Sequence, residues 1–486
     1  MGGNSKNRFD AVIVGLGPTG AMIANLLGME GLSVLALDRE KNVYDLPRAV
    51  HFDDEIKRAF QTIGISAQLA ESVIVNKGMR FLDYDGNLLL DWPREQSITS
   101  NGWHASYRFH QPDLEKIMRA ALRQYPNVTT KLGCIVNQVK EDRDSVVVHY
   151  STTTGNQQSE VVTADYVIGA DGARSIVREA MGADMNMLGF QQRWLVTDLI
   201  LKRPMPELGD HTVQYCDVVR PATYCRNPGL RRRWEFALHD HETDEEMTKP
   251  EMVWSLLDRW ITPEDAELER IAVYTFKSCV ADRWKKGRMF IAGDAAHLTP
   301  PFMGQGMCAG IRDAVNLSWK ISRVQRDNAP EELLDSYESE RKPNVSRFIE
   351  TAVGLGELIN RIGTGEQFEK DKKMESIQSS LGPGLGSGSD PLRGRLFPQF
   401  KLSNGLMSDD FVGTNAFIAR KNGADDSEIG LRVLTGKREP ALMAVLDKLQ
   451  TDEVIVRPDR YILASAHKKL SANKRLKNEL AMLLRQ

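Results

Sequence analysis

The sequence has few cysteines, and their positions do not suggest cross-linking. Five occur in 486 residues, and they are widely scattered. No two form a C-x-x-C pair, which argues against a disulfide framework and against a thiolate metal site. We therefore expect a protein of the reducing cytoplasm without a metal centre. The five are Cys134, Cys216, Cys225, Cys279 and Cys308.

Long blocks of one charge are also absent. Lys and Arg total 63 and Asp and Glu total 66, so the formal net charge is −3. This balance gives no indication of a nucleic-acid-binding surface. The run of residues 11 to 29 has no charge and is long enough to suggest a membrane span. Pro18, Thr19, Asn25 and several glycines interrupt it, so we expect no membrane span.

The composition that is present is that of an ordinary globular chain. Hydrophobic residues make up 41% of the sequence and charged residues 27%. Such a chain can bury large cores, and its length predicts roughly three folding units.

The first recognisable unit is a strand, a glycine-rich turn and a helix. Residues 9 to 14 (FDAVIV) are typical of a buried parallel strand, and Gly15-Leu16-Gly17-Pro18-Thr19-Gly20 follows directly. A second apolar strand, residues 32 to 37, ends at Asp38. This order is that of a dinucleotide-binding unit.

Each glycine of this turn has a separate expected task. Gly15 allows a tight turn, Gly17 lets the backbone approach a pyrophosphate, and Gly20 permits close helix packing. The start of the helix then directs unpaired N–H groups and a positive dipole end at the phosphates. Asp38 is placed to accept hydrogen bonds from an adenosine ribose. The unit therefore indicates an ADP moiety without deciding between FAD and NAD.

Two further segments also consist of an apolar strand followed by a turn with an acidic residue and a glycine. Residues 165 to 178 (DYVIGADGARSIVR) form an apolar strand ending in Asp171-Gly172, and residues 287 to 310 (GRMFIAGDAAHLTPPFMGQGMCAG) contain a strand ending in Gly293-Asp294. With GLGPTG, these segments resemble the three signatures of the class A, single-component FAD-dependent aromatic hydroxylases.

Other segments narrow this resemblance to one branch. Residues 46 to 53 (LPRAVHFD), 231 to 236 (RRRWEF), 298 to 320 (LTPPFMGQGMCAGIRDAVNLSWK) and 456 to 461 (VRPDRY) resemble the branch that contains 3-(3-hydroxyphenyl)propionate hydroxylase and phenol hydroxylase-like proteins. The resemblance covers nearly the whole chain and is weakest between residues 413 and 452.

The last of the three segments also suggests its own chemistry. A carboxylate at Asp294 suits the ribityl hydroxyls of a flavin. The loop from Pro300 to Gly306 is stiff at its proline end and permissive at its glycine end, so backbone can pass close to a flat ring. A helix starting near Met307 would direct its positive end toward a reduced, negatively charged flavin.

The resemblance extends the expected FAD site and implies how the nicotinamide is used. It implies that Arg48 and Gln111 contact FAD, and that Asp171 and Gly172 serve both FAD and the incoming NAD(P)H. Because the chain has one G-x-G-x-x-G motif, we expect NAD(P)H to bind only transiently. The expected FAD-binding residues are Gly15, Gly17, Pro18, Thr19, Gly20, Asp38, Arg39, Arg48, Gln111, Asp171, Gly172, Gly293, Asp294, Pro301, Gly304, Gln305, Gly306 and Met307.

The expected fold class is α/β (α+β), with a Rossmann-like FAD-binding domain, an inserted β-sheet substrate domain and a shortened thioredoxin-like C-terminal domain. The expected divisions are 1–185 for the first FAD-binding part with a small sheet insert, 186–280 for the substrate-binding sheet, 281–378 for the second FAD-binding part with long helices, 379–393 for a Gly/Ser linker, and 394–486 for the C-terminal domain. In the last of these, residues 470 to 484 suggest a helix with one apolar face.

The implied function is hydroxylation of a phenolic or related electron-rich ring with NAD(P)H and O₂. The resemblance implies that the nicotinamide reduces FAD, and that O₂ adds at flavin C4a to give the hydroperoxide that attacks the ring. Alternatives are epoxidation or halogenation on the same fold, or a non-catalytic FAD-binding redox sensor. The W-x-W-x-I-P motif of flavin halogenases is absent from the sequence.

The group that removes the phenolic proton is not fixed by the sequence. His51 is the candidate catalytic base, although a hydrogen-bonded structural histidine explains it at least as well. Gln214, Tyr215, Tyr224 and Pro300 are candidate pocket residues, although strand aromatics are often core. A propionate side chain on the substrate would need an arginine, and the arginines at 231 to 233 offer three, although surface exposure explains this triplet more simply. The aromatic substrate, the choice between NADH and NADPH, and the oligomeric state, for which a homodimer is allowed, stay open.

Overall fold

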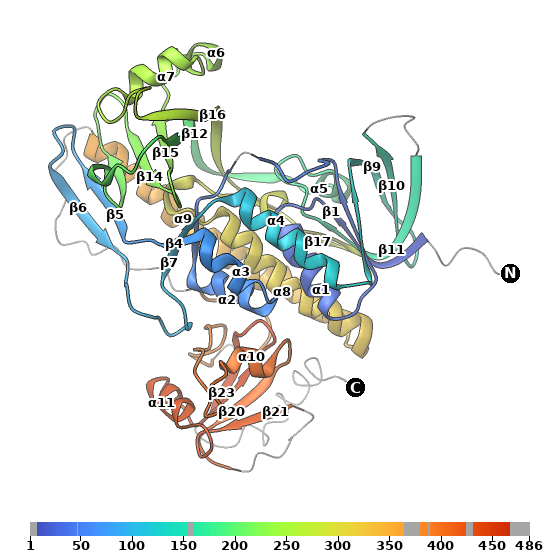
Figure 1. Ribbon diagram of the computed structural model, residues 1–486. Helices are drawn as coiled ribbons and strands as arrows, with labels where there is room; N and C mark the ends of the chain where they lie inside the picture. Colours follow the sequence, from blue (N-terminus) through green and yellow to red (C-terminus); the bar gives the residue numbers. More distant parts are fainter. Residues whose placement is uncertain are drawn as a thin grey trace.

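The computed structural model describes residues 7–45, 47–153, 159–363, 379–386, 389–423 and 431–466. Within them the chain forms a mixed helix and sheet structure, with a large upper body and a smaller C-terminal unit beneath it (Figure 1). No helix in these ranges is both long and apolar enough to cross a lipid bilayer.

An eight-stranded sheet forms the base of the large body. Its main path runs β17-β18-β11-β1-β2-β8, and β10 and β9 extend it from β11. Strands β18, β11, β1, β2 and β8 are parallel to one another, so their carboxyl ends lie at one edge. The strands are β1 (Arg8–Val14), β2 (Val34–Asp38), β8 (Val128–Leu132), β9 (Cys134–Glu141), β10 (Val146–Thr152), β11 (Ser159–Gly169), β17 (Lys285–Lys286) and β18 (Met289–Ile291).

Helix α1 (Pro18–Met29) explains the uncharged run of the sequence. It packs against β1 and β2 and against α8 (Gly306–Asp327), so it is enclosed by protein and has no solvated face to carry charge. The other main helices are α2 (Asp54–Thr62), α3 (Ser66–Leu69), α4 (Gln111–Ala121), α5 (Ile176–Met181) and α9 (Ser336–Gly363).

A second eight-stranded sheet lies to the left of the first in Figure 1, and its two faces have different neighbours. One face forms an apolar core with α7 (Pro250–Leu257), near α6 (Asp244–Met247). The opposite face lies toward β3 (His51–Asp53), β4 (Val73–Val75) and β7 (Ser106–Phe109), which form a small third sheet. The second sheet contains β5 (Gly78–Leu82), β6 (Leu88–Pro93), β12 (Met185–Leu201), β13 (Thr212–Tyr215), β14 (Ala222–Arg226), β15 (Arg231–Ala237), β16 (Ala266–Ala281) and β19 (His297–Leu298).

The C-terminal unit is a four-stranded sheet with its own apolar core. The strand order is β21-β20-β22-β23, and α11 (Pro440–Lys448) covers one face. The strands are β20 (Phe417–Arg420), β21 (Arg432–Thr435), β22 (Glu453–Val456) and β23 (Ile462–Ala466), with α10 (Ser408–Val412) beside them. The helix expected at residues 470 to 484 lies outside the described residues.

Buried charges join the C-terminal unit to the large body. Arg457 donates two hydrogen bonds to Glu340 of α9, at 2.7 and 2.8 Å, and also binds Asp459. Asp459 in turn accepts from Asn316 and Trp319 of α8. Every one of these side chains is buried, so each charge has its partner inside the protein.

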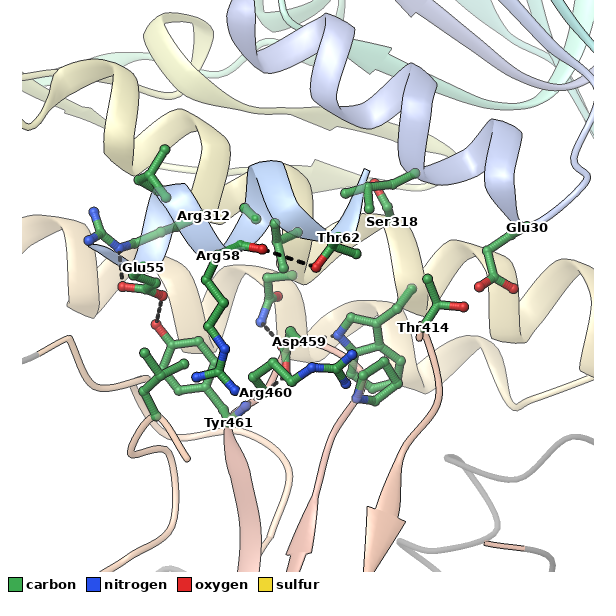
Figure 2. A pocket seen from close by; sticks show the side chains of 18 residues that line it. Glu30, Glu55, Arg58, Thr62, Arg312, Ser318, Thr414, Asp459, Arg460 and Tyr461 are labelled. Atoms are coloured by element: carbon green, nitrogen blue, oxygen red, sulfur yellow. Dashed lines mark hydrogen bonds and ion pairs between the residues drawn. The ribbon is translucent and has the colours of Figure 1, made fainter. Parts of the chain in front are cut away.

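A small cavity lies beside these contacts, between α2, α8 and the C-terminal unit (Figure 2). At its edge Arg58 binds both oxygens of Asp409, and the hydroxyl of Tyr461 donates to Glu55 at 2.5 Å. The cavity occupies about 60 Å³. At this cavity the two units therefore meet through polar contacts.

The glycines of the segment predicted as a linker pack closely. A Cβ on Gly382 would lie 2.4 Å from the carbonyl oxygen of Ser339 in α9. The amide of Leu385 donates to Glu340, and the amide of Ser465 in β23 donates to Asp390. In the described part of residues 379–393, the small residues therefore allow a close approach to α9.

Arg457→Met tests the buried interface. The substitution removes the guanidinium and leaves Glu340 and Asp459 buried with fewer partners, so the free energy of unfolding should fall by about 3–5 kcal/mol. Urea unfolding measures it. Arg203→Met, which removes an exposed arginine paired with Glu207 and Asp265, is the matched control and should cost less than about 1 kcal/mol. Equal, small effects of the two changes would contradict this role.

Candidate functional site

The glycine-rich turn forms an open cradle at the end of β1. Gly15 has φ +94°, and a Cβ there would lie 2.4 Å from the carbonyl oxygen of Ala170. A Cβ on Gly20 would collide with Gly15, whereas one on Gly17 would meet nothing within 4 Å. Helix α1 starts at Pro18, and no side chain caps it. Its free N–H groups therefore face a space that suits an anion.

Asp38 stabilises this turn from the end of β2. Its carboxylate accepts from the amide of Leu16 at 2.9 Å and lies 3.2 Å from Arg119 of α4. The neighbouring Arg39 is exposed and pairs with Glu40. Asp38 thus lies at the sheet edge where the sequence places it, with one of its oxygens already bound to the turn.

The second turn follows β11 and contains a carboxylate oxygen without a partner. Asp171 accepts from the amide of Ile176 through Oδ2, while its buried Oδ1 accepts no hydrogen bond in the described structure. Burial raises the pKa of this carboxyl above its ordinary value. Gly172 has φ +80° and open space around its Cα. This turn therefore has an unused acceptor and room beside it.

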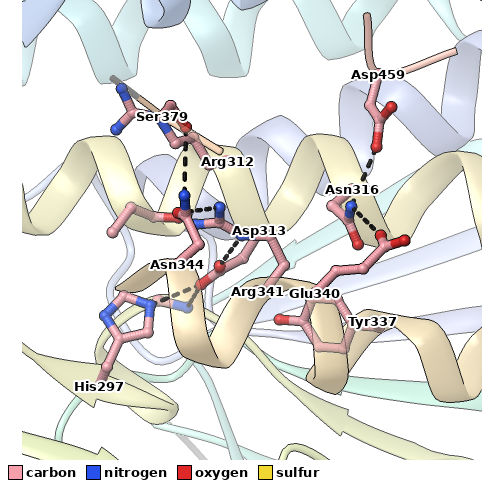
Figure 3. A network of polar contacts seen from close by, with 12 residues as sticks. His297, Arg312, Asp313, Asn316, Tyr337, Glu340, Arg341, Asn344, Ser379 and Asp459 are labelled. Carbon is pink, nitrogen blue, oxygen red and sulfur yellow. Dashed lines mark hydrogen bonds and ion pairs between the residues drawn. The ribbon is translucent and has the colours of Figure 1, made fainter. Parts of the chain in front are cut away.

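The third turn, at Gly293-Asp294, is fixed by buried polar contacts (Figure 3). Asp313 of α8 accepts from the amide of Gly293 at 3.1 Å, from His297 at 2.7 Å and from Arg341 of α9 at 2.9 Å. Burial alone would raise the pKa of Asp313, but His297 and Arg341 hold it below its ordinary value. The carboxylate therefore stays charged and holds the turn against α8.

Asp294 itself extends into accessible space. Its side chain is exposed, yet the protein around it raises the pKa of its carboxyl, with His297 and Arg48 acting in the opposite direction. Thr19 of α1 lies directly under Gly293 and Gly310, at distances that leave no room for a Cβ. The first and third turns are therefore in contact, and Asp294 lines the space beside them.

The proline loop lies at the start of α8. Pro300 is buried, Pro301 begins a short 3₁₀ turn that ends at Met303, and Gly304 has φ +62°. The side chain of Gln305 accepts a hydrogen bond from Arg312 and donates one to Asp53. Arg312 also donates to Asp53, at 2.5 Å.

Beyond the loop, the first turn of α8 leaves room for a ligand. A Cβ on Gly306 would meet nothing within 4 Å, and no side chain caps the helix. Met307, the next residue, packs against the main core. The loop is therefore fixed by its neighbours and open on one side.

Arg48 and Gln111 are brought together by the backbone. The side-chain oxygen of Gln111, the first residue of α4, accepts from the amides of Arg48 and Ala49 at 2.9 and 2.6 Å. The Arg48 side chain is exposed and lies over Tyr44. Gln111 therefore binds residues 48 and 49 from their buried side, and the Arg48 side chain lies on their exposed side.

Both ring nitrogens of His51 have partners. Nε2 lies 2.8 Å from the hydroxyl of Ser106, and Nδ1 lies 3.3 Å from the carbonyl oxygen of Gly304. Burial and the positive charge of Arg108 lower the pKa of His51 to about 3. The imidazole is therefore neutral at physiological pH, with Nδ1–H donating to Gly304 and Nε2 accepting from Ser106.

The candidate pocket residues do not lie together. Gln214 and Tyr215 are neighbours on β13, and alternation along a strand sends them to opposite faces. Gln214 is buried and accepts from Thr223 at 2.7 Å, whereas Tyr215 and Tyr224 pack in the core near α7. Only Gln214 of these three therefore points to the face nearest the third sheet.

The expectation of a surface arginine triplet is wrong for two of its three members. Arg233 is 2% exposed and binds Asp198, which lies directly opposite it on β12. It also donates to the carbonyl oxygens of Pro47 and Arg48. Arg232 is buried too, and donates to backbone carbonyls. Only Arg231, paired with Glu269, is partly exposed.

These features together suit an extended dinucleotide. Three turns meet at one sheet edge, two helices begin there without side-chain caps, and open positions at Gly17, Gly172 and Gly306 leave room for a ligand. The orphaned Asp171 oxygen adds an acceptor. The arrangement is that of a nucleotide-binding α/β protein with room for FAD.

Comparison with known proteins identifies the family. The family described as FAD binding domain matches residues 8–352. A relative from Rhodococcus jostii, described as a probable NADH-specific resorcinol 4-hydroxylase, is 35% identical over 447 residues, covering 90% of this chain and 83% of its own. A 3-(3-hydroxy-phenyl)propionate/3-hydroxycinnamic acid hydroxylase from Burkholderia cenocepacia is 36% identical over 376 residues, covering 76% and 68%. The chain belongs to the FAD binding domain family, and the expected relationship to FAD-dependent aromatic hydroxylases is confirmed.

A solved structure confirms the fold. The complex of aklavinone-11 hydroxylase with FAD and aklavinone matches with a TM-score of 0.84 at 21% identity, and the match covers 100% of both chains. At that identity the likeness establishes the mixed helix and sheet fold alone.

Several residues with structural tasks at the site were not assigned from the sequence. Four of them lie in the quoted motifs, and Asp198 and Arg341 lie outside these motifs. The contacts that they make come from distant segments and could not be read from spacing. These residues are Asp53, Asp198, Arg233, Arg312, Asp313 and Arg341.

Asp54, at the start of α2, predicts a pH dependence of stability. Burial, together with the charge of Asp53, raises its pKa to about 6, although Thr99 and Asn101 donate to it. A carboxyl with a raised pKa stabilises the folded state fully below about pH 4 and loses that contribution as the pH rises through about 6.

Asp54→Asn should remove this dependence. Between about pH 4 and pH 7 the variant should gain up to about 3 kcal/mol relative to the wild type in the free energy of unfolding. Urea unfolding at both pH values measures it, with Asp85→Asn on an exposed turn as the control for loss of a charge. A difference between wild type and variant that is the same at both pH values would contradict the assignment.

Proposed function

We propose that the protein is an FAD-dependent monooxygenase of the cytoplasm that hydroxylates a phenolic ring with NADH and O₂. The observation that carries the proposal is the convergence of the three turns, with open glycine positions, at one sheet edge. The names of the relatives supply the chemistry, because they specify resorcinol and hydroxyphenylpropionate as substrates and NADH as a reductant. Five free, buried cysteines support a reducing compartment.

In this proposal the turns hold successive parts of FAD. The open backbone at Gly17 and the start of α1 bind the pyrophosphate, and Asp38 with Arg39 lies toward the adenosine end. Asp294 faces the ribityl hydroxyls, and Asp171 with Gly172 lies where FAD and the incoming nicotinamide meet. Arg48, held from behind by Gln111, covers the cofactor from outside.

The proline loop and α8 receive the flavin ring. Gly304, Gln305 and Gly306 present backbone to it, and the positive end of α8 stabilises negative charge on it. When bound, FAD supplies the redox chemistry, accepting a hydride from NADH and activating O₂ for transfer to the aromatic ring. The chain's own task is to orient the ring, exclude water and keep the nicotinamide exchangeable.

His51 takes a positioning role in this proposal. Its neutral ring donates to the Gly304 carbonyl and accepts from Ser106, which in turn accepts from Asn76. The lone pair that a general base would use is therefore already occupied. His51 holds the loop that carries the flavin, and the phenolic proton leaves by another group.

Gly17→Val tests the assignment of FAD. The backbone at Gly17, with φ −70°, accepts a side chain without strain, and only the ligand competes for the space. The variant should fold but retain less than about a tenth of the FAD of the wild type, which corresponds to a loss of at least about 1.4 kcal/mol. Flavin absorbance per protein measures it. Gly354→Val in α9, where a Cβ also meets nothing, is the control. Full FAD occupancy in Gly17→Val would refute the assignment.

Turnover tests the reaction itself. NADH oxidation should be slow in the absence of a phenol and accelerate with resorcinol or 3-(3-hydroxyphenyl)propionate, and mass spectrometry should find a product with one added oxygen atom. The physical reason is that oxygen activated with no ring nearby is lost as hydrogen peroxide, so a protein without this control would waste NADH. An FAD-loaded protein that transfers oxygen to no phenol in a wide screen would be a redox sensor instead.

His51→Phe separates positioning from proton removal. Loss of the two hydrogen bonds should release the Gly304 loop and lower the ratio of product to NADH consumed, by a factor that does not depend on pH. The ratio is measured from about pH 6 to pH 9, which spans the ordinary histidine pKa. Recovery of hydroxylation at high pH, where the phenol ionises unaided, would instead identify His51 as the base.

A further inference from the structure

Arg108 is a buried cation between the third sheet and the second. It lies on β7, directly opposite His51 on β3 in the antiparallel register, and is 9% exposed. Its side chain reaches β13, where it donates to the hydroxyl of Thr212. His51 in turn contacts Gly304, so Arg108 lies one residue away from the proline loop.

Unlike Arg233, Arg270 and Arg312, Arg108 has no carboxylate partner among the described residues. Arg233 and Arg270 share Asp198, and Arg312 takes Asp53 and Glu55. A guanidinium has five N–H donors, and Thr212 accepts from one nitrogen of Arg108. The other donors are not enclosed by protein, since no Arg108 atom is among the buried polar atoms without a partner.

The charges around Arg108 leave the region positive. Burial lowers its pKa, Glu235 and Cys225 act in the opposite direction, and Arg233 lowers it further. Glu235 is the nearby carboxyl group, and it forms no ion pair with Arg108. Burial also raises the pKa of Glu235, which disfavours its negatively charged form. On the other side, Arg94 adds positive charge and His51 is neutral. A buried cation of this kind is costly unless an anion joins it.

Resting on the proposed function, we propose that Arg108 binds an anionic oxygen of the aromatic substrate and so selects phenols that carry one. The oxygen belongs either to a side-chain carboxylate or to an ionised ring hydroxyl. A planar guanidinium suits both, because it presents parallel N–H groups and keeps its charge at any physiological pH. Arg233, the alternative from the sequence, is fully engaged by Asp198, Pro47 and Arg48.

The test compares ligand binding in matched variants. The FAD-loaded wild type, Arg108→Met, Arg108→Lys and Arg231→Met are titrated with 3-(3-hydroxyphenyl)propionate, resorcinol and 3-ethylphenol, and flavin absorbance reports binding. Arg231→Met makes the same substitution at the partly exposed end of β15 and should change nothing. Arg108→Met should raise the Kd of the anionic ligand about 10- to 100-fold, the range of a charge-assisted hydrogen bond. Arg108→Lys should lie between.

The pattern of losses identifies the oxygen. A loss confined to 3-(3-hydroxyphenyl)propionate identifies the carboxylate. A loss for all three, with wild-type affinity that strengthens as the phenol ionises and a variant that lacks this pH dependence, identifies the phenolate. Wild-type affinities in Arg108→Met, or an equal and pH-independent weakening of every ligand, would overturn the proposal.

The experiment also distinguishes loss of FAD in Arg108→Met from failure of the proposed function. If Arg108→Met does not retain FAD, Arg108→Lys decides, because the same order of losses should remain at smaller size and equal affinities would overturn the proposal. Turnover by the wild type tests the proposed function independently. A wild type that binds these phenols without oxidising them refutes the hydroxylase, and the binding comparison at Arg108 still stands or fails by its own result.

Discussion

The buried polar contacts of helix α8 connect the turns of the site, helix α9 and the C-terminal unit. Arg312 holds Gln305 and the start of α2, Asp313 holds the Gly293 turn, and Asn316 reaches both α9 and the C-terminal unit. Each of these charges and amides would be costly to bury alone, and each is satisfied by a segment far away in the sequence. One helix therefore sets the proline loop, the third turn and the docked C-terminal sheet relative to one another.

That rigidity explains why the glycines matter in two different ways. Some, such as Gly15 and Gly20, are required because neighbouring backbone leaves no room for a Cβ. Others, Gly17 and Gly306, have empty space beside them, which is what a protein surface built around a bound ligand requires. The first kind positions the turns, and the second kind leaves room for FAD. In our proposal Arg108 follows the same logic on the substrate side: it donates to Thr212, it has no carboxylate partner among the described residues, and the substrate supplies the anion.

The sequence predicted the parts of the site that depend on local order. Strand, turn, helix and acid follow one another around Gly15 and Asp38, and the parallel sheet brings the ends of β1, β11 and β18 together as expected. The sequence did not predict which face of a strand is buried, or which distant residue is the partner of a side chain. The alternation that separates Gln214 from Tyr215 was visible, but which face meets the core under α7 was not. The buried Arg233 looked like a surface residue because its partners, Asp198 and the carbonyl of Pro47, lie in other segments. The divisions expected for the domains and the role of each site residue stay predictions.

The most direct test of this account is the affinity for FAD of Asp313→Asn. The change keeps the size of the side chain and removes the charge that holds His297, Arg341 and the Gly293 amide together. If the contacts of α8 hold the turns around the cofactor, the Kd for FAD, measured by equilibrium dialysis of the folded variant, should rise at least about tenfold, which is about 1.4 kcal/mol. An unchanged Kd in a folded protein would show that the turns keep their positions without α8, and would contradict the account.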